Sequence, residues 1–356
     1  MTESEITSFD TFYTTRYMGA KYKLLDLIIP RVHDLLPEGG VFVDLMAGTH
    51  AVGYALKSRN VIFANDIQHY SFIFGQALIM NSNVLSVKTR VLKDFEGISE
   101  CLSAGWFSKT YGETYFSTEQ CLQIEAIRSR ISTLEDETVK SVYLTVLTNA
   151  MSLCQSSAGH FAQFMPSTSA RIQSLRKMNL LDTFISKSIS VEITQPKFAN
   201  KVFKEEGISL LHRLTASNQL PKGSLVYLDP PYTSAQYSRY YHLLETVILN
   251  DQPNVNFKAL YRDGRFQSPF CSSRLAPSAF KEVARGASQS GSSLLISYSN
   301  AGVLSVESIE EICRAFYHKI EVFKKPYAHS MQGRGVKKDR EEIVISCSGP
   351  KKSAQL

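Results

Sequence analysis

Hydrophobic residues in the first part of the chain alternate between a helical stripe and short buried runs. Apolar residues recur at helical spacing in 21–36, which predicts a helix with a kink or a break at Pro30. Continuous apolar runs at 41–45 and 61–64 predict short strands that are buried on both faces. Helices are expected near 51–58 and 67–81. This order of elements predicts the opening of a parallel, doubly wound α/β sheet.

The pattern changes in the middle of the chain, where strands are hard to find. Segment 85–190 is polar and helix-prone, with helices predicted at 119–130 and 138–154 and a loop at 109–115. This segment is typical of an insertion or a second subdomain. We therefore expect a sheet domain in two parts, 1–84 and 191–350, split by a mainly helical insertion.

The strand pattern resumes in the last part of the chain. Apolar runs at 223–229 and 293–298 predict two more buried strands. Alternating apolar and polar residues at 320–324 and 341–346 predict a terminal hairpin, with a basic loop between its strands.

Composition excludes several classes of protein. The 356 residues are 44% hydrophobic, which is enough for a core and excludes wholesale disorder. No run is long and apolar enough to span a membrane, and the polar start lacks the pattern of a secretory signal, so a cytoplasmic protein is expected. The six cysteines are scattered without metal-site spacing, so free thiols and no metal are expected. The net charge of +6 permits nucleic acid as a partner without requiring it.

The strongest chemical signal is the sequence Asp229-Pro230-Pro231-Tyr232, directly after a predicted strand. Open α/β sheets bind their ligands at the carboxyl ends of strands. A carboxylate, a carbonyl fixed by proline and an aromatic ring together suit a planar amino group, because two acceptors take its hydrogens and the ring stacks on the base.

A second cluster surrounds the turn between the first strand and its helix. Asp44, Gly48 and Gly53 occupy this turn, and Asp66 follows the next strand. The glycines allow a ligand to approach the backbone closely, and an acid at the end of the second strand can accept two ribose hydroxyls.

These segments resemble, in order, motifs of the D12 class of adenine-N6 DNA methyltransferases, which includes the Dam methylases. Residues 16–22 resemble the amino-terminal motif, 44–53 with 64–66 the cofactor loop and ribose-binding acid, and 229–232 the catalytic motif. The resemblance implies a Rossmann-like methyltransferase sheet with an inserted, mainly helical target-recognition domain. It also implies S-adenosylmethionine as cofactor, double-stranded DNA as partner and a cognate restriction endonuclease as a possible companion.

The resemblance further implies roles for individual residues. Asp229, Pro230 and Tyr232 would hold a flipped-out adenine for methyl transfer without a metal. The residues implied to bind the cofactor are Tyr17, Lys21, Asp44, Gly48, Asp66 and Asp229. The chain departs from the pattern at His50, where the class usually has a second glycine. Glu206 is the candidate for a further acid near the cofactor's adenine end.

Contacts to DNA are expected from two regions. Tyr237 and Arg239 follow the catalytic motif, and Arg334, Lys337 and Lys338 lie in the basic loop, where phosphate contact is expected. Arginines of the middle segment, such as Arg128, Arg130 and Arg176, are weaker candidates for the same role. The predicted function is site-specific DNA adenine-N6 methylation. Methylation of RNA adenine or of cytosine N4, or DNA binding without turnover, remains open as an alternative.

Overall fold

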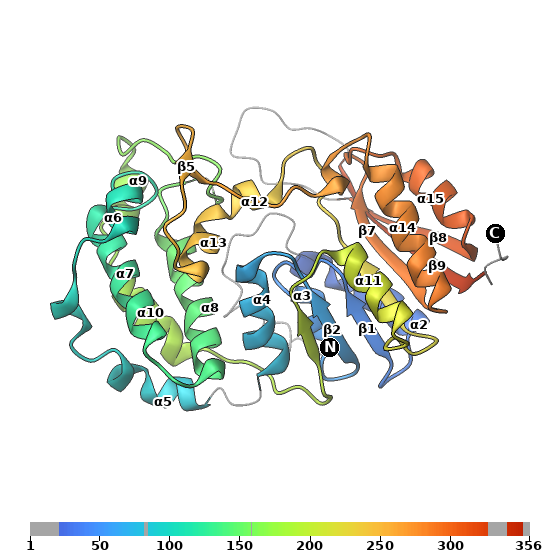
Figure 1. Ribbon diagram of the computed structural model, residues 1–356, viewed down its shortest axis with the longest axis horizontal. Coiled ribbons are helices and arrows are strands. Elements are labelled where there is room, and N and C mark those ends of the chain that lie inside the picture. The colour runs from blue at the N-terminus through green and yellow to red at the C-terminus, as the bar shows by residue number, and fades with distance from the viewer. Residues whose placement is uncertain (1–20, 82–84, 158, 327–339, 352–356) are drawn as a thin grey trace. The chain divides into compact units, whose positions relative to one another are not determined.

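The computed structural model describes residues 21–81, 85–157, 159–326 and 340–351 (Figure 1). The chain folds into two compact units. Among the described residues, the sheet unit consists of Lys21–Ile67, Lys197–Tyr237 and the residues from Phe266 on, and the helical unit consists of Gln68–Pro196 and Ser238–Arg265. The helical unit thus begins before the predicted insertion at 85–190 and includes a second segment. The catalytic-motif residues and the cofactor-loop residues all belong to the sheet unit.

The sheet unit is built on a seven-stranded sheet with the order β3-β2-β1-β4-β7-β9-β8. Neighbours from β3 to β7 are parallel, whereas β9 pairs antiparallel with both β7 and β8. The strands are β1 (Val41–Asp44), β2 (Val61–Asn65), β3 (Lys201–Phe203), β4 (Leu225–Leu228), β7 (Ser293–Ser299), β8 (Tyr317–Pro326) and β9 (Glu341–Pro350). This mixed α/β fold confirms the mostly parallel sheet and the terminal hairpin predicted from the strand pattern.

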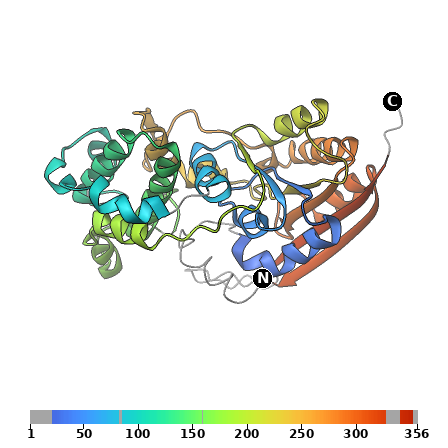
Figure 2. The same cartoon turned by 90° about the horizontal axis from the view of Figure 1, so that it is seen from below.

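Helices cover both faces of this sheet (Figures 1 and 2). On one face, α11 (Gly207–Ala216), α14 (Ala276–Gln289) and α15 (Val306–Arg314) pack side by side. On the other face, α2 (Leu25–Leu35) packs against α3 (Ala51–Leu56). Short 3₁₀ turns are found at η1 (Lys21–Leu24) and η4 (Pro269–Cys271). Two-sided coverage explains why the central strands are continuous apolar runs.

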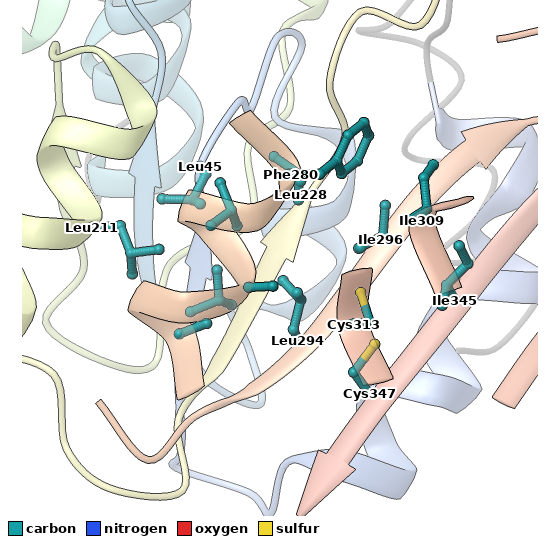
Figure 3. Packing of buried hydrophobic residues seen from close by; sticks show 14 of the residues in the cluster. Leu45, Leu211, Leu228, Phe280, Leu294, Ile296, Ile309, Cys313, Ile345 and Cys347 are labelled. Carbon is teal, nitrogen blue, oxygen red and sulfur yellow. The ribbon is translucent and has the colours of Figure 1, made fainter. Parts of the chain in front are cut away.

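The larger hydrophobic cluster lies between the sheet and the α11, α14 and α15 layer (Figure 3). Alternate residues of each strand enter it, including Leu228 of β4 and Ile345 of β9. The residues between them therefore face the side covered by α2, and Phe42 stacks on Tyr227 with ring centroids 5.7 Å apart. This alternation decides which polar side chains can meet at the sheet edge.

Of the kink or break predicted at Pro30, the break is wrong, because α2 runs as a single helix from Leu25 to Leu35. Proline removes the bond that a backbone N–H would donate to the carbonyl of Asp26. Pro30 and Asp26 are both exposed, so water can hydrate that carbonyl. The helix therefore tolerates the proline.

The helical unit is centred on α8 (Glu137–Cys154), most of whose side chains are buried. The helices α4 (His69–Gly75), α7 (Thr118–Ser132) and α10 (Leu180–Ser190) pack against it. The other elements of this unit are η2 (Gln76–Met80), α5 (Leu85–Asp94), η3 (Ile98–Cys101), α6 (Trp106–Tyr111), α9 (Ala170–Arg176), α13 (His242–Leu249) and the two-stranded pair β5 (Val255–Asn256) and β6 (Tyr261–Arg262). A four-residue helix, α12 (Tyr237–Tyr240), lies where the chain passes from one unit to the other. The predicted loop at 109–115 is wrong in its first residues, which complete α6.

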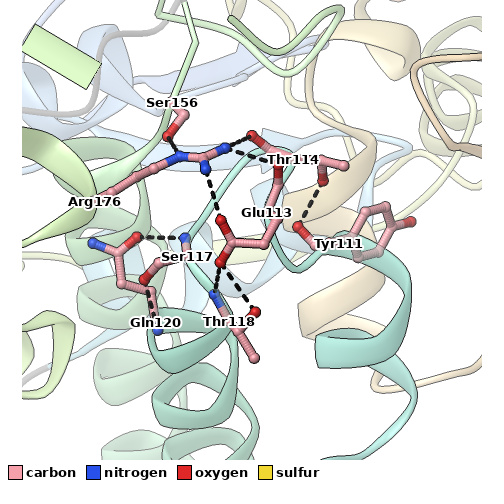
Figure 4. Close-up of polar contacts among 8 residues, drawn as sticks. All are labelled: Tyr111, Glu113, Thr114, Ser117, Thr118, Gln120, Ser156 and Arg176. Atoms are coloured by element: carbon pink, nitrogen blue, oxygen red, sulfur yellow. Dashed lines mark hydrogen bonds and ion pairs between the residues drawn. The ribbon is translucent and has the colours of Figure 1, made fainter. Parts of the chain in front are cut away.

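Arg176 holds the turn after α6 in place (Figure 4). Its guanidinium donates to Glu113 Oε2 at 2.8 Å, to the carbonyls of Glu113 and Thr114 at 2.8 and 3.0 Å, and to Ser156 Oγ at 3.1 Å. Arg128 similarly donates to the carbonyls of Val247 and Ile248, 2.8 and 3.0 Å away. Both arginines, which were weak candidates for phosphate contact, thus make bonds inside the helical unit.

The Arg176 contacts predict a stability effect. Replacing Arg176 with Met removes these bonds; water can hydrate the exposed Glu113 carbonyl, but the part-buried Thr114 carbonyl loses its donor, which costs about 1 kcal/mol. We expect a lower melting temperature for Arg176→Met in a thermal unfolding experiment. Arg171→Met is the matched control, since Arg171 lies exposed on the same helix. Equal melting temperatures for the two variants would contradict this role of Arg176.

Candidate active site

The central contact of the candidate site is an ion pair between Lys21 and Asp229. Lys21 Nζ lies 2.7 Å from Asp229 Oδ1, and the two side chains are 5% and 18% exposed. Lys21 begins η1, and Asp229 directly follows β4. Burial raises the pKa of Asp229 above its ordinary value, and the ammonium of Lys21 opposes that shift. The pair therefore places a charged donor on a strand-end carboxylate.

Tyr232 completes this side of the site. Its ring lies edge-on to Tyr298, with centroids 5.9 Å apart, and Lys21 Nζ lies 5.7 Å from the centre of the Tyr232 ring. Its hydroxyl donates to Glu342 Oε1 over 3.4 Å. Burial raises the pKa of Tyr232, so the hydroxyl stays protonated at neutral pH.

Two further acids lie at the ends of β1 and β2. Asp66 Oδ2 accepts from the backbone N–H of Gly48 at 3.0 Å, which ties the loop after β1 to the end of β2. Asp44 is buried; it accepts a bond from the backbone N–H of Met46, while its Oδ1 has no hydrogen-bond partner within the described part of the chain. Burial, with the nearby charges of Asp229 and Asp66, raises the pKa of Asp44 well above its ordinary value.

The loop after β1 has an unusual backbone. Gly48 and His50 both take left-handed conformations, with φ of 53° and 61°. His50 is fully buried and is the N-cap residue directly before α3. A left-handed residue favours glycine because a side chain crowds the following carbonyl. His50 therefore adopts the conformation that explains a glycine preference at this place.

Asn65, a buried residue at the end of β2, fixes the strand edge. Its side-chain N–H groups donate to the carbonyls of Leu45 and Glu205, each at 3.0 Å, and its oxygen accepts from the backbone N–H of Glu205 at 3.0 Å. These bonds connect the chain after β1, the end of β2 and the segment after β3. Asp66 is thereby held beside the loop that begins α3.

Glu206 acts as a helix cap. Its carboxylate accepts from the backbone N–H groups of Ile208 and Ser209 at 3.2 and 2.8 Å. These bonds satisfy the first turn of α11 and hold the carboxylate at the helix end.

The sequence-derived site residues divide into three groups. Lys21 and Asp229 are in direct contact, as are Gly48 and Asp66, and Tyr232 lies beside the first pair. Arg239 donates to the Tyr261 hydroxyl at 2.8 Å within the helical unit, while Tyr237 begins α12. The predicted residues Tyr17, Arg334, Lys337 and Lys338 lie outside the described residues.

Sequence reasoning missed Glu342. It is 6% exposed, lies on β9 opposite Ser299 of β7, and contacts Tyr232. A signal was present, because Ile343 and Ile345 enter the hydrophobic cluster, and strand alternation places Glu342 on the opposite face. Its pairing beside β7, however, could not be read from the sequence.

The acids suit a cationic ligand. Asp44, Asp66 and Asp229 place carboxyl groups at the carboxyl edge of neighbouring strands, and the Asp44 Oδ1, which has no partner among the described residues, can accept a further bond. Within the described residues, no cluster of His, Cys, Asp and Glu has the arrangement of a metal site. No described helix is long and apolar enough to cross a membrane.

The mostly parallel sheet thus carries a carboxylate, two prolines and a tyrosine directly after β4. The sequence matches the family described as "D12 class N6 adenine-specific DNA methyltransferase" over residues 17–312, and the chain belongs to this family. Membership implies a methyl donor of the S-adenosylmethionine type.

Individual relatives are distant. The chain is 26% identical over 335 residues to the Type II methyltransferase M.FokI of Planomicrobium okeanokoites, covering 88% of this chain and 49% of the relative. It is 25% identical to the modification methylase StsI of Streptococcus sanguinis, covering 92% and 50%. Type II methyltransferase M.NlaIII of Neisseria lactamica is 26% identical, with 84% and 88% covered. The chain thus spans about half the length of the first two relatives.

The buried Asp44 predicts a pH-dependent effect on stability. Its raised pKa means that the folded chain binds a proton more tightly than the unfolded chain does, so stability falls as pH rises through that pKa. Asp44→Asn removes the buried charge and keeps an acceptor for Met46. We expect a gain of about 1 kcal/mol at alkaline pH that shrinks on acidification.

Thermal melts from about pH 4, near the ordinary pKa of an aspartate, to about pH 9 measure this difference. Asp34→Asn is the control, because Asp34 is exposed on α2. A constant difference between Asp44→Asn and the wild type across the range would refute the buried charge as the cause.

Proposed function

We propose that the protein is a site-specific DNA methyltransferase that transfers a methyl group from S-adenosylmethionine to N6 of an adenine in duplex DNA. The observation that carries the proposal is the placement of Asp229 and Tyr232 at the strand end beside Lys21, in a member of the D12 family. Asp44, Gly48 and Asp66 form the neighbouring edge, where the methyl donor would bind.

The chemistry follows from what these residues can do. The exocyclic nitrogen of adenine is a poor nucleophile, because its lone pair is delocalised into the ring. The Asp229 carboxylate and the Pro230 carbonyl accept its two hydrogens, which favours tetrahedral geometry and turns the lone pair outward. S-adenosylmethionine supplies an electrophilic methyl group on a sulfonium. Positioning and electrostatics are then sufficient, without a covalent enzyme intermediate.

The target base must leave the duplex. Extrusion costs a few kcal/mol, which stacking on the Tyr232 ring partly offsets. The face of this ring is also approached by the Lys21 ammonium, at 5.7 Å from its centre. The target base and the Lys21 ammonium therefore compete for the face of the Tyr232 ring.

The remaining roles concern DNA recognition. The helical unit is proposed to read the target sequence, since its larger segment, Gln68–Pro196, lies between the cofactor loop and the catalytic motif in the chain. Tyr237, Arg239 and the basic residues Arg334, Lys337 and Lys338 are proposed DNA contacts. The relatives are named as Type II methyltransferases and modification methylases. A cognate restriction endonuclease is therefore the proposed partner system.

Methylation mapping tests the function. We expect long-read sequencing of a bacterial host that lacks its own N6-methyladenine to detect this base in one short motif when the protein is expressed. Asp229→Ala removes an acceptor of the amino group and should lower the rate by at least about 100-fold. Asp34→Ala, a matched change on the exposed face of α2, should methylate like the wild type.

Other outcomes identify the alternatives. N4-methylcytosine in the mapped DNA would replace adenine by cytosine as the target. Modified RNA with unmodified DNA would change the substrate class. A soluble, folded protein that modifies neither would overturn the proposed activity and leave DNA binding without turnover.

A further inference from the structure

Glu342 is a buried acid for which the proposed reaction has no role so far. It lies at the start of β9, opposite Ser299 of β7, and its side chain is almost fully shielded from solvent. Burying a carboxylate is costly unless it is paired. The Glu342 carboxylate beside the candidate site therefore needs a hydrogen-bond donor or a cation as its partner.

The contacts of Glu342 leave one oxygen open. Oε1 accepts the hydroxyl of Tyr232 over 3.4 Å, which is a long bond. Oε2 is buried and has no hydrogen-bond partner within the residues that the structure describes. Burial raises the pKa of Glu342, and the Lys21 ammonium is the strongest influence opposing that rise; Arg340 also opposes it, more weakly.

Asp229 and Glu342 both affect the pKa of Lys21. Burial is the largest single influence and would lower the pKa of Lys21, but the nearby acidic groups, Asp229 first among them, together outweigh it, and the pKa lies above its ordinary value. Tyr232 and Glu342 add to the same rise. The ammonium is therefore charged and lies within electrostatic reach of two carboxylates, of which it bonds to Asp229 at 2.7 Å.

This arrangement weakens base binding as long as the ion pair stays intact, because a carboxylate accepts at both oxygens and Oδ1 is already bonded to the ammonium. The proposed function requires the Asp229 carboxylate to accept a hydrogen from adenine N6, whereas Lys21 Nζ holds Oδ1. An ammonium that keeps this bond also draws charge from the carboxylate and weakens it as an acceptor. Moving a buried ammonium away without a new anion would be strongly unfavourable.

We propose that Glu342 is a positioning residue that receives the Lys21 ammonium when the target base enters, so that Asp229 becomes free to accept the amino group. The open Oε2 supplies the acceptor, and the exchange keeps Lys21 paired with a carboxylate throughout. Tyr232 lies between the two positions, since it contacts Glu342 through its hydroxyl and Lys21 across its ring. The inference rests on the proposed methyltransferase function.

A double-mutant cycle of Lys21→Met and Glu342→Gln tests this exchange. Glutamine keeps an acceptor for Tyr232 but removes the charge that would hold the ammonium. We expect Glu342→Gln to lower kcat by about 10- to 100-fold, because Lys21 then stays bonded to Asp229 and this carboxylate is poorly positioned to accept the amino group. KM for duplex DNA should change by less than about threefold, because contacts to the duplex remain.

The second arm of the cycle separates exchange from support of Tyr232. In the Lys21→Met background, Glu342→Gln should have no further effect, since no ammonium remains to be received. A 2-aminopurine at the target position reports base extrusion without turnover, so the cycle can be measured even in inactive variants. Lys21→Gln gives the same cycle if Lys21→Met does not fold.

Glu341→Gln is the matched control, because Glu341 precedes Glu342 on β9 and its carboxylate lies 3.9 Å from Lys324. This variant should retain wild-type kcat. A wild-type kcat for Glu342→Gln, or an equal loss in both Lys21 backgrounds, would overturn the exchange. A wild type that methylates no DNA would instead refute the proposed function, which keeps the two failures distinct.

Discussion

The burial of the Lys21 ammonium against Asp229 is the interaction on which the candidate site depends. A carboxylate enclosed at the end of a central strand is costly to ionise, and the adjacent cation makes the ionised form accessible. Asp44 ends β1, which lies beside β4 in the sheet although β2 and β3 come between them in the chain. Asp44 therefore shares the electrostatic surroundings of Asp229. The arrangement stores negative charge where a cationic methyl donor and a base amino group would both be received. Ionising Asp44 at this place lowers the stability of the folded chain, as its raised pKa indicates.

The pairing of the strands places the acidic residues close together. Parallel pairing of β1 with β2 and β4 brings three strand ends to one edge, while alternation separates residues of the hydrophobic cluster from residues that face α2. Asn65 then fastens the loop segments at that edge through three hydrogen bonds. The side chains of the candidate site are few, but each lies next to a strand or helix that packs in the hydrophobic core.

Much of this could be read from the sequence, because continuous apolar runs identify buried strands and short motifs mark their ends. Six strands of the seven-stranded sheet, the terminal hairpin and the family followed from such local signals, whereas the short edge strand β3 did not. Glu342 did not, since its position depends on β9 pairing with β7 across a long stretch of chain. Arg176 was misjudged for a related reason: a basic side chain is identical in sequence whether it meets a phosphate or, as here, the carbonyls of a turn. The helix through Pro30 persisted because its exposed face can be hydrated.

The position of β9 also bears on biosynthesis. This strand follows β8 in the chain, yet it lies between β7 and β8 in the sheet. During translation β8 emerges first and has no neighbour to pair with until β9 has been made. The sheet must therefore be completed from the outside inward, and Glu342 arrives with the strand that closes it. A ribosome-bound chain that lacks β9 would hold Asp229 and Tyr232 but neither the acid beside Tyr232 nor a finished sheet.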